Sequence, residues 1–264
     1  MSTIISEGPL LVSLENGVKT ITFNQPEKRN AINSKMSTLF RDAVLASEHD
    51  ESRVIVITGS GDHFCAGADL APSSSSGGKF DVSQFLRSTY NPLVTAIRKM
   101  DKPFVAKVRG NCVGAGFSFA LACDLFYASP DAKMSQIFTK IGLSSDGGGG
   151  YFLPEKIGYH KAFELMALHE MITADQAEKL GIVNKVVAAD KLDEYVDGIV
   201  DRLINGAYLA IQRTKSNLRA AMTQGLEAAL EQEADNQGLN FKSKDFFEGV
   251  AAFLQKRKAN FKGE

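Results

Sequence analysis

Hydrophobic and polar residues alternate at the start of the chain, and the spacing then changes to that of amphipathic helices. Residues 10–14 and 18–23 alternate on either side of Asn16-Gly17, a dipeptide typical of tight hairpin turns, and predict two antiparallel strands. After a polar loop, Asn33 or Ser34 can cap a helix whose apolar residues recur at helical spacing.

Strands and helices alternate through the middle of the chain, which is the pattern of an α/β protein. Runs of apolar and β-branched residues predict strands at 54–58, 103–108, 125–128, 133–136 and 183–187. Helical spacing is found at 82–100, 117–123, 160–168 and 173–181. We expect Pro92 to kink or split the first of these helices. Thr173 and Gln176 predict a capping box at the start of the last one.

The pattern is helical from about residue 190 to the end of the chain. Two sets of apolar residues in this part are spaced for buried stripes, namely Tyr208, Ile211 and Leu218, and Leu226, Ala229 and Leu230. We therefore expect two regions, an α/β core over residues 1–190 and a C-terminal helical region over residues 191–264.

Composition narrows the class of protein. Hydrophobic residues make up 44%, charged residues 23%, and the formal net charge is −1, so we expect neither nucleic acid nor an anionic membrane as a partner. Apolar runs fall short of a membrane span, and the N-terminus does not resemble a signal peptide. The three cysteines have no metal-like pairing and indicate buried thiols in a reducing compartment. These features predict a cytoplasmic protein.

Two glycine-containing segments each follow a predicted strand, at residues 65–69 and 113–116. The first amides of a helix have no acceptor within the helix, so two such segments that meet can direct a pair of N–H groups at one oxygen atom. The alternative is that each segment is only a tight turn. Neither matches a dinucleotide-binding or P-loop motif.

Asp146 is an isolated carboxylate in a mostly apolar stretch, followed by four glycines. Burial disfavours the charged form, so we expect a raised pKa and a group that can take up and return a proton near neutral pH. The alternative is that Asp146 caps a helix that begins at Gly147.

The other polar candidates have weaker claims. Surface positions are expected for all four histidines, which are His49, His63, His160 and His169. We expect Asp69 and Asp124 to cap helices or to form turns. The pattern of His, Cys and Asp residues does not have metal-site spacing, so no metal is predicted.

Several segments in order along the chain resemble the crotonase (enoyl-CoA hydratase/isomerase) superfamily. The clearest are Phe64-Cys-Ala-Gly-Ala-Asp-Leu70 and Arg109-Gly-Asn-Cys-Val-Gly-Ala-Gly116. Further similar segments lie at residues 24–32, 122–124, 141–143, 177–186 and 248–257. The resemblance implies an α/β fold, a spiral of ββα units with a C-terminal helical part that trimerises, and acyl-CoA thioesters as substrates.

The resemblance also implies roles for the two glycine-containing segments. The family's two N–H donors fall on Ala68 and Ala115, which would hold the thioester oxygen and stabilise an enolate. In family hydratases two glutamates activate water, and the corresponding positions here are Ser118 and Phe138. Because neither residue is acidic, hydration of a double bond is not expected.

Asp146 is then the remaining acid, at the place where single-acid isomerases of the family carry Asp or Glu. The resemblance implies that it moves a proton from C2 to C4 of a 3-enoyl-CoA. Isomerisation of a ring-epoxide phenylacetyl-CoA also uses a single Asp here and is the leading alternative. An alternative of another class is a non-catalytic protein that binds acyl-CoA.

Contacts to the substrate are also implied by the resemblance. The residues expected at the substrate site are Lys28, Arg29, Ala66, Gly67, Asp69, Leu70, Gly116, Ser118, Phe138, Phe253 and Lys256. Phe253 and Lys256 match tail contacts that a neighbouring subunit can donate. Coenzyme A would enter as part of the substrate, so no separate cofactor is expected. Self-association as a trimer or a dimer of trimers is expected. Residues 73–78, a Ser/Gly run, are expected to form a loop beside the acyl group.

Overall fold

The computed structural model describes residues 3–6, 8–70 and 80–264, and the predicted Ser/Gly loop lies outside them. A seven-stranded sheet has the order β1-β2-β3-β4-β5-β7-β10, and a three-stranded sheet has the order β6-β8-β9. The strands of the large sheet are β1 (Thr3–Ser6), β2 (Leu10–Glu15), β3 (Val18–Phe23), β4 (Val54–Gly59), β5 (Phe104–Val108), β7 (Leu125–Ala128) and β10 (Lys185–Val186). The small sheet contains β6 (Asn111–Val113), β8 (Lys133–Ser135) and β9 (Ile172–Thr173).

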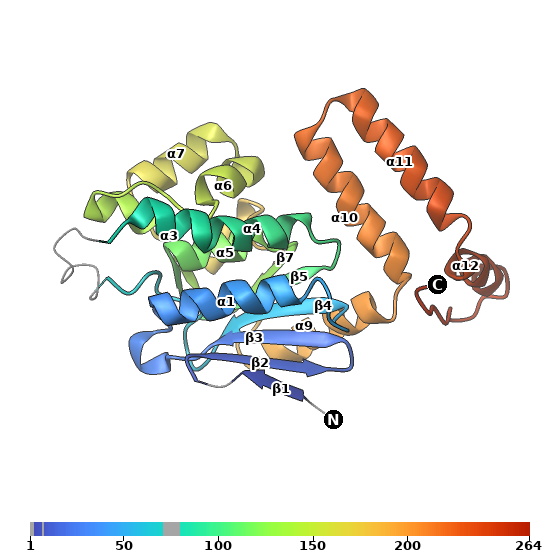
Figure 1. The fold of residues 1–264 in the computed structure, drawn as a ribbon, viewed down its shortest axis with the longest axis horizontal. Coiled ribbons are helices and arrows are strands. Elements are labelled where there is room, and N and C mark those ends of the chain that lie inside the picture. Colours follow the sequence, from blue (N-terminus) through green and yellow to red (C-terminus); the bar gives the residue numbers. More distant parts are fainter. Residues whose placement is uncertain (1–2, 7, 71–79) are drawn as a thin grey trace.

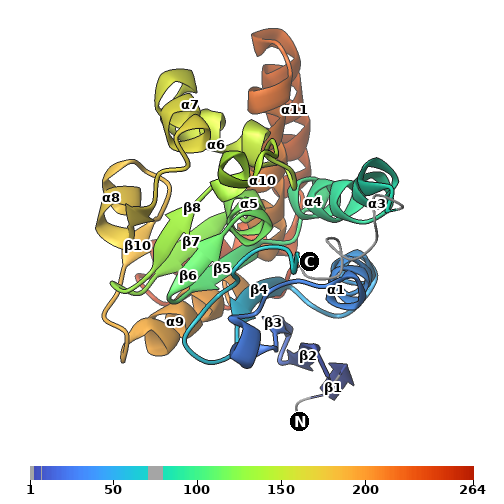
Figure 2. The same cartoon turned by 90° about the vertical axis from the view of Figure 1, so that its left-hand side faces the viewer.

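Helices cover both faces of the large sheet (Figures 1 and 2). One face carries α1 (Ser34–Ala46), α3 (Val82–Ser88), α4 (Tyr90–Lys99) and α5 (Ala115–Ala122), and the other carries α9 (Leu192–Ile204). The remaining elements are η1 (Pro26–Lys28), η2 (Ile137–Ile141), α6 (Gly149–Ile157), α7 (Tyr159–Ala167), α8 (Ala174–Lys179), α10 (Tyr208–Thr223), α11 (Leu226–Asn240) and α12 (Lys244–Leu254).

The residues of β4 show why the sheet is covered on both sides. Ile55 and Ile57 belong to the main hydrophobic cluster beneath α1, α4 and α5. Val54 and Val56 point to the opposite face and belong to the cluster formed with α9. Because side chains alternate along a strand, a continuous apolar run supplies two cores at once.

Local signals in the sequence predicted several element boundaries. The hairpin forms, and Asn16 adopts a positive φ of 50° at its turn. The Asn33 side chain caps α1 by accepting from the amide of Met36. Thr173 and Gln176 form the predicted capping box. The helix at 82–100 is split at Thr89, so that Pro92 lies in the first turn of α4, where its missing N–H is tolerated.

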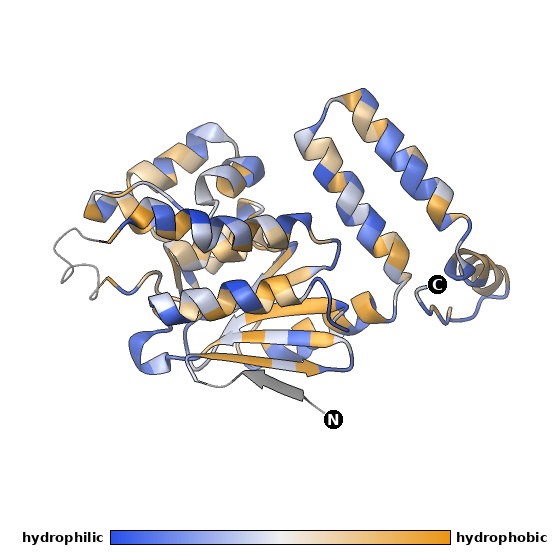
Figure 3. Cartoon of the chain, viewed as in Figure 1, coloured by the Kyte–Doolittle hydropathy of each residue, from blue (hydrophilic) through white to orange (hydrophobic). Residues whose placement is uncertain are grey.

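The helices α10, α11 and α12 project away from the sheet and form an arm at one end of the molecule (Figure 1). The two predicted stripes are not buried within the chain. The exposed fractions are 63% for Leu218, 70% for Leu226 and 53% for Leu230, whereas Tyr208 and Ala229 are buried. Figure 3 shows orange hydrophobic segments alternating with blue ones along this arm. The prediction of buried stripes is therefore wrong for Leu218, Leu226 and Leu230, which no described residue covers, and right for Tyr208 and Ala229.

The boundary near residue 190 remains a prediction, because α9 packs on the large sheet while the projecting helices begin at Tyr208. Among the described residues, no helix is long and apolar enough to cross a membrane.

Candidate active site

The loop that follows β4 carries Ala68, the first of the two predicted amide donors. The amide of Ala66 donates to the carbonyl oxygen of Arg29 at 3.0 Å, that of Ile32 donates to Gly67 at 2.8 Å, and that of Asp69 donates to Ile32 at 2.9 Å. These bonds fix the loop on both sides of Ala68. The Ala68 amide has no hydrogen-bond acceptor within the described part of the chain, and the residue is exposed.

A second amide lies at the start of α5. Ala115 is the first residue of this helix, so its amide has no acceptor inside the helix. The preceding Gly114 has a φ of +57°, and a Cβ placed on it would stand 3.7 Å from the Cα of Gly67. The two glycine-containing segments therefore lie against each other, as the oxyanion hypothesis requires.

Asp146 lies between η2 and α6, and the structure excludes a capping role for its side chain. The helix begins at Gly149 with Gly148 as its N-cap, and its N-cap has no side-chain hydrogen bond. Asp146 Oδ1 is buried and has no hydrogen-bond partner among the described residues. Burial raises the pKa of Asp146 to about 6, as the sequence led us to expect.

The loop that carries Asp146 contacts the first turn of α5. The Ser118 hydroxyl donates to the main-chain oxygen of Asp146 at 2.8 Å, and the Ser118 amide donates to Gly114 at 3.1 Å. The main chain at Asp146 therefore contacts the helix whose first residue is Ala115. The negative charge of Asp146 also adds to the effect of burial in raising the pKa of Tyr90, which places this ring near the carboxylate.

Phe138 closes this region with an apolar ring. Its side chain is only 8% exposed, and a Cβ on Gly114 would stand 3.9 Å from the Cζ atom of Phe138. The ring thus lies where the two glycine-containing segments meet. A phenyl ring excludes water there and has no group that could activate it.

The structure brings some predicted substrate contacts to this region. Lys28 forms a 3.3 Å ion pair with Asp69, next to Ala68. Arg29 is exposed and holds the loop through its main-chain oxygen. Leu70 is 48% exposed at the end of the same segment.

Gly116 and the tail residues have other surroundings. Gly116 lies against Cys65, where a Cβ would stand 2.6 Å from the Cβ of the cysteine, so its role is close packing of α5. Phe253, which is 82% exposed, lies on α12, and Lys256 follows that helix. In Figure 1 this helix lies on the far side of α10 and α11 from α5. One chain therefore does not bring its own tail residues to Asp146.

Several other sequence expectations can be compared with the structure. The three cysteines are buried, as predicted. His49, His160 and His169 are exposed, as predicted. His63 is half-buried, and its Nδ1 atom accepts a hydrogen bond from the amide of Asn111 at 3.1 Å. Asp124 anchors a turn by accepting the amide of Phe104 at 2.8 Å.

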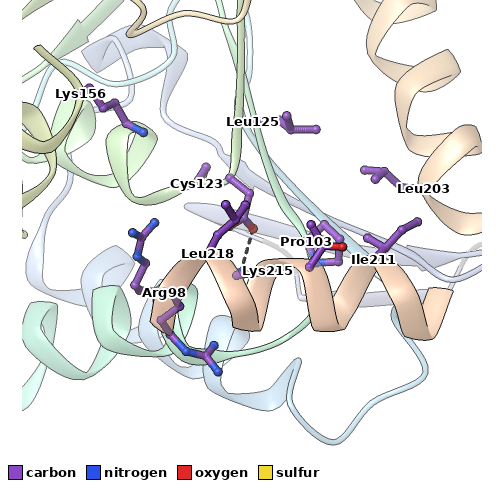
Figure 4. Close-up of a pocket in the computed structure, with 12 residues that line it drawn as sticks. Arg98, Pro103, Cys123, Leu125, Lys156, Leu203, Ile211, Lys215 and Leu218 are labelled. Carbon is purple, nitrogen blue, oxygen red and sulfur yellow. Dashed lines mark hydrogen bonds and ion pairs between the residues drawn. The ribbon is translucent and has the colours of Figure 1, made fainter. Parts of the chain in front are cut away.

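A hollow of about 290 Å³ lies elsewhere, between α4, α6 and α10 (Figure 4). Pro103 and Leu125 line it at the starts of their strands, whereas Ala68 and Ala115 follow strand ends, so the hollow is at the opposite edge of the sheet. Lys215 lines this hollow, but its ammonium group already donates to Asp124 Oδ2 at 2.8 Å and to two carbonyl oxygens. We do not assign catalysis to this hollow.

Comparison with known proteins decides the family. The sequence profile of the enoyl-CoA hydratase/isomerase family matches residues 13–264. The chain belongs to this family. It is 34% identical to the 1,2-epoxyphenylacetyl-CoA isomerase of Escherichia coli (strain K12) over 97% of this chain and 98% of that protein. It is 36% identical to a probable enoyl-CoA hydratase of Rhodobacter capsulatus over 95% and 96% of the two chains.

Solved structures of the family have the same fold. A putative enoyl-CoA hydratase/isomerase from Mycobacterium abscessus superposes with a TM-score of 0.92 at 32% identity, covering 97% of this chain and all of that chain. This crotonase-type relationship confirms the predicted fold and the membership in an enzyme family. Isomerases and hydratases occur among relatives of similar identity, so names alone do not choose the reaction.

Two polar residues near Asp146 were not singled out from the sequence. Gln136 is buried beside Ser118, and Ser145 donates to Gln136 Oε1 at 3.0 Å. A polar residue at the end of the predicted strand 133–136 was the only signal for Gln136, and it is a weak one.

Proposed function

We propose that this family member is an acyl-CoA isomerase that moves a double bond from C3 to C2. In this proposal Asp146 removes a proton from C2 of a 3-enoyl-CoA and returns it at C4. The electron pair of the C2–H bond passes to the thioester oxygen as an enolate. When C4 takes up the proton, the double bond is left between C2 and C3, in conjugation with the thioester.

The observation that carries this proposal is the buried Oδ1 atom of Asp146, which has no hydrogen-bond partner among the residues that the structure describes. An unsatisfied buried oxygen is costly, and such atoms are rare unless they have a use. A pKa of about 6 leaves the carboxylate mostly ionised at neutral pH but still able to hold a proton briefly. Ser118 and Phe138 supply no second acid, so activation of water for hydration has no matching group at those positions.

In this proposal the amides of Ala68 and Ala115 stabilise the enolate. Proton removal beside a thioester places negative charge on its oxygen, and the amides of Ala68 and Ala115 would stabilise that charge. Each such donor contributes roughly 3–4 kcal/mol in enzymes where one has been removed. The ring of Phe138 would exclude the water that could otherwise compete for the proton.

An activity panel with an Asp146→Asn variant tests the proposal. The panel compares a 3-enoyl-CoA, a 2-enoyl-CoA in water and an epoxy-aromatic thioester. We expect turnover of the 3-enoyl-CoA by the native chain, loss of that turnover in the variant, and retained CoA-ester binding. High hydration activity, or full isomerase activity of Asp146→Asn, would overturn the proposal.

A second candidate is isomerisation of a ring-1,2-epoxyphenylacetyl-CoA. It is favoured by the 34% identical relative that carries this name. Three aromatic rings contact one another near Asp146: the Phe85 and Tyr90 centroids are 5.2 Å apart, and those of Tyr90 and Phe119 are 5.0 Å apart. The third substrate of the panel separates the two candidates.

Binding of coenzyme A as part of the substrate, and self-association, belong to the same proposal. The exposed apolar side chains of α10–α12 support an assembly, because large exposed apolar patches are typical of interfaces. Phe253 and Lys256 would then meet the nucleotide of a neighbouring subunit's substrate. A Phe253→Ser variant with native mass in sedimentation but a raised KM for CoA esters would support that contact, and an unchanged KM would remove it.

A further inference from the structure

A short network of buried polar groups holds the main chain at Asp146. The Ser118 side chain is completely buried, and its hydroxyl lies 2.8 Å from the main-chain oxygen of Asp146. Its other acceptors, Gly114 O at 3.4 Å and Gln136 Oε1 at 3.5 Å, are more distant. Since a hydroxyl has one proton, the shortest bond, to Asp146, is the one it makes.

Gln136 sets the direction of that hydroxyl. Its Nε2 atom donates to Ser118 Oγ at 3.2 Å, which occupies the oxygen of Ser118 as an acceptor and leaves its proton for Asp146. Gln136 is itself oriented by Ser145, whose hydroxyl donates to Gln136 Oε1 at 3.0 Å. Gln136 is 2% exposed, so this chain of three side chains is protected from water where it meets Asp146.

Glycines allow the loop to approach the network this closely. A Cβ on Gly149 would stand 2.5 Å from Ser145 Oγ and 2.7 Å from both Gln136 Oε1 and Ser118 Oγ. Gly147 has a φ of +60°, which L side chains rarely adopt. Gly147 and Gly149 are therefore required where the loop packs on the three polar side chains.

The network matters because the Asp146 carboxylate is not held directly. Its Oδ1 atom has no partner within the described residues, so hydrogen bonds to that atom do not fix it. The position of the side chain depends on its main chain, which Ser118 holds from one side and the amide of Gly149 holds at 3.1 Å from the other. Direct donors to the carboxylate would have lowered its pKa and weakened it as a base.

We infer that Ser118 and Gln136 are positioning residues that fix the Asp146 carboxylate through its main-chain oxygen. This inference rests on the proposed role of Asp146 as the proton-transferring group. Ser118 and Gln136 do not touch the reacting atoms in this scheme. They keep the carboxylate over the substrate and keep its surroundings dry while leaving its oxygens free for the proton.

The test compares Ser118→Ala and Gln136→Met with the control Ser129→Ala. Ser129 is also completely buried and donates to a carbonyl oxygen, that of Val108 at 3.4 Å, but its hydrogen bonds join the ends of β7 and β5 and do not include Ser118, Gln136 or Asp146. We expect each network variant to lower kcat by about 10- to 100-fold with KM within about twofold, since small misplacements of a reacting group have effects of this size. The control is expected to keep its kcat.

A measurement independent of catalysis distinguishes positioning from a loss of structure. The pKa of the Asp146 carboxyl is followed by carbon NMR in the native chain and in each folded variant. We expect it to fall from about 6 toward the ordinary value of 3.8 in Ser118→Ala and Gln136→Met, because a loosened loop admits water, and to stay in place in Ser129→Ala. Unchanged pKa and kcat in both network variants would overturn the inference.

The double variant Ser118→Ala/Gln136→Met adds a second check. Because Gln136 acts through Ser118, the double variant should lose little more activity than Ser118→Ala alone. If the loss of activity in the double variant equalled the product of the two single losses, the two residues would act separately. That result would overturn the inference that Gln136 acts through Ser118. Failure of the proposed function is a different result: Asp146→Asn would stay active, whereas the NMR pKa of Asp146 could still respond to Ser118 and Gln136.

Discussion

Two partly buried carboxylates in this molecule have opposite surroundings. Asp50 accepts from Lys19 Nζ at 2.7 Å and from the amide of Ser52 at 2.9 Å. Burial raises its pKa, but the bonds from Lys19 and Ser52 outweigh burial and bring the pKa down to about 2. Asp146 has no bond at Oδ1 within the described chain, and burial alone raises its pKa to about 6.

The difference shows what each carboxylate is for. Lys19 is a buried ammonium group that connects β3 to the end of α1, donating also to Ala43 O and Ser47 Oγ. Asp50 balances this charge, so its charge stabilises the fold. Asp146 Oδ1 has no partner among the described residues, and burial of its charge disfavours folding. A fold that satisfies one buried acid fully and leaves another unpaired is expected where the second acid serves a substrate.

The largest expected effect separates the two acids by activity. Asp146→Asn should lower kcat for 3-enoyl-CoA by about 10³-fold or more, since a general base typically contributes 10²–10⁴-fold. Asp50→Asn should leave kcat per folded molecule within about threefold, because Asp50 lies at the far end of α1 and supports structure only. Active-site titration of the folded fraction makes the two values comparable. A comparable loss of kcat in both variants would contradict the assignment of a catalytic role to Asp146 and a structural role to Asp50.

The next effect reverses the order when stability is measured. Asp50→Asn leaves the Lys19 ammonium, whose side chain is 2% exposed, without its charged partner, and we expect a loss of about 3–5 kcal/mol in unfolding free energy. The control is Glu194→Gln, which breaks the exposed Lys191–Glu194 pair at 3.1 Å and should cost under about 1 kcal/mol. Denaturant unfolding of both variants gives the comparison. Equal losses would show that Asp50 is no more important than a surface acid.

The sequence predicted the fold wherever a local signal coincided with a physical requirement. Asn16-Gly17 tolerates the positive φ of the hairpin turn, and Asn33 and Thr173 offer the side-chain acceptors that helix starts need. Each of these signals works within a few residues, so distant parts of the chain do not alter it.

Other features depend on distant parts of the chain and could not be read in this way. An aspartate before glycine can cap a helix or remain a free acid, and only the start of α6 at Gly149 decides between them. Gln136 matters because α5 and the Asp146 loop both reach it. For Leu226, periodicity indicates an apolar face but says nothing about what covers it.

A smaller effect is the dependence of stability on pH, with opposite sign at the two acids. The folded pKa of Asp146 lies above its ordinary 3.8, so its stabilising contribution is complete below pH 4 and is lost as pH rises through 6. Asp146→Asn should therefore be more stable than the native chain by up to about 3 kcal/mol above pH 6 and nearly equal to it below pH 4. Unfolding curves between pH 4 and pH 8 measure this difference. A variant that is less stable at high pH would contradict the unpaired state of Asp146.

For Asp50 the sign is the reverse. Its folded pKa of about 2 lies below 3.8, so its contribution of about 2 kcal/mol is present above pH 4 and is lost as pH falls through 2. The native chain should therefore lose this stabilising contribution when it is unfolded by acid, and the unfolding free energy of the Asp50→Asn variant should lack this dependence on pH.

The smallest expected effect tests whether hydrogen bonds or charge set the properties of Asp50. Ser52→Ala removes the hydroxyl that donates to Asp50 Oδ1 but keeps the Ser52 amide and the Lys19 ion pair. We expect a loss of about 1–2 kcal/mol, the usual contribution of a hydrogen bond to a charged group, and a rise in the pKa of Asp50. Urea unfolding and carbon NMR of the carboxyl measure the two quantities. If the pKa stayed at about 2, the Ser52 amide and the ion pairs with Lys19 and Lys102 would be sufficient without the Ser52 hydroxyl, and the contrast with Asp146 would not depend on that hydroxyl.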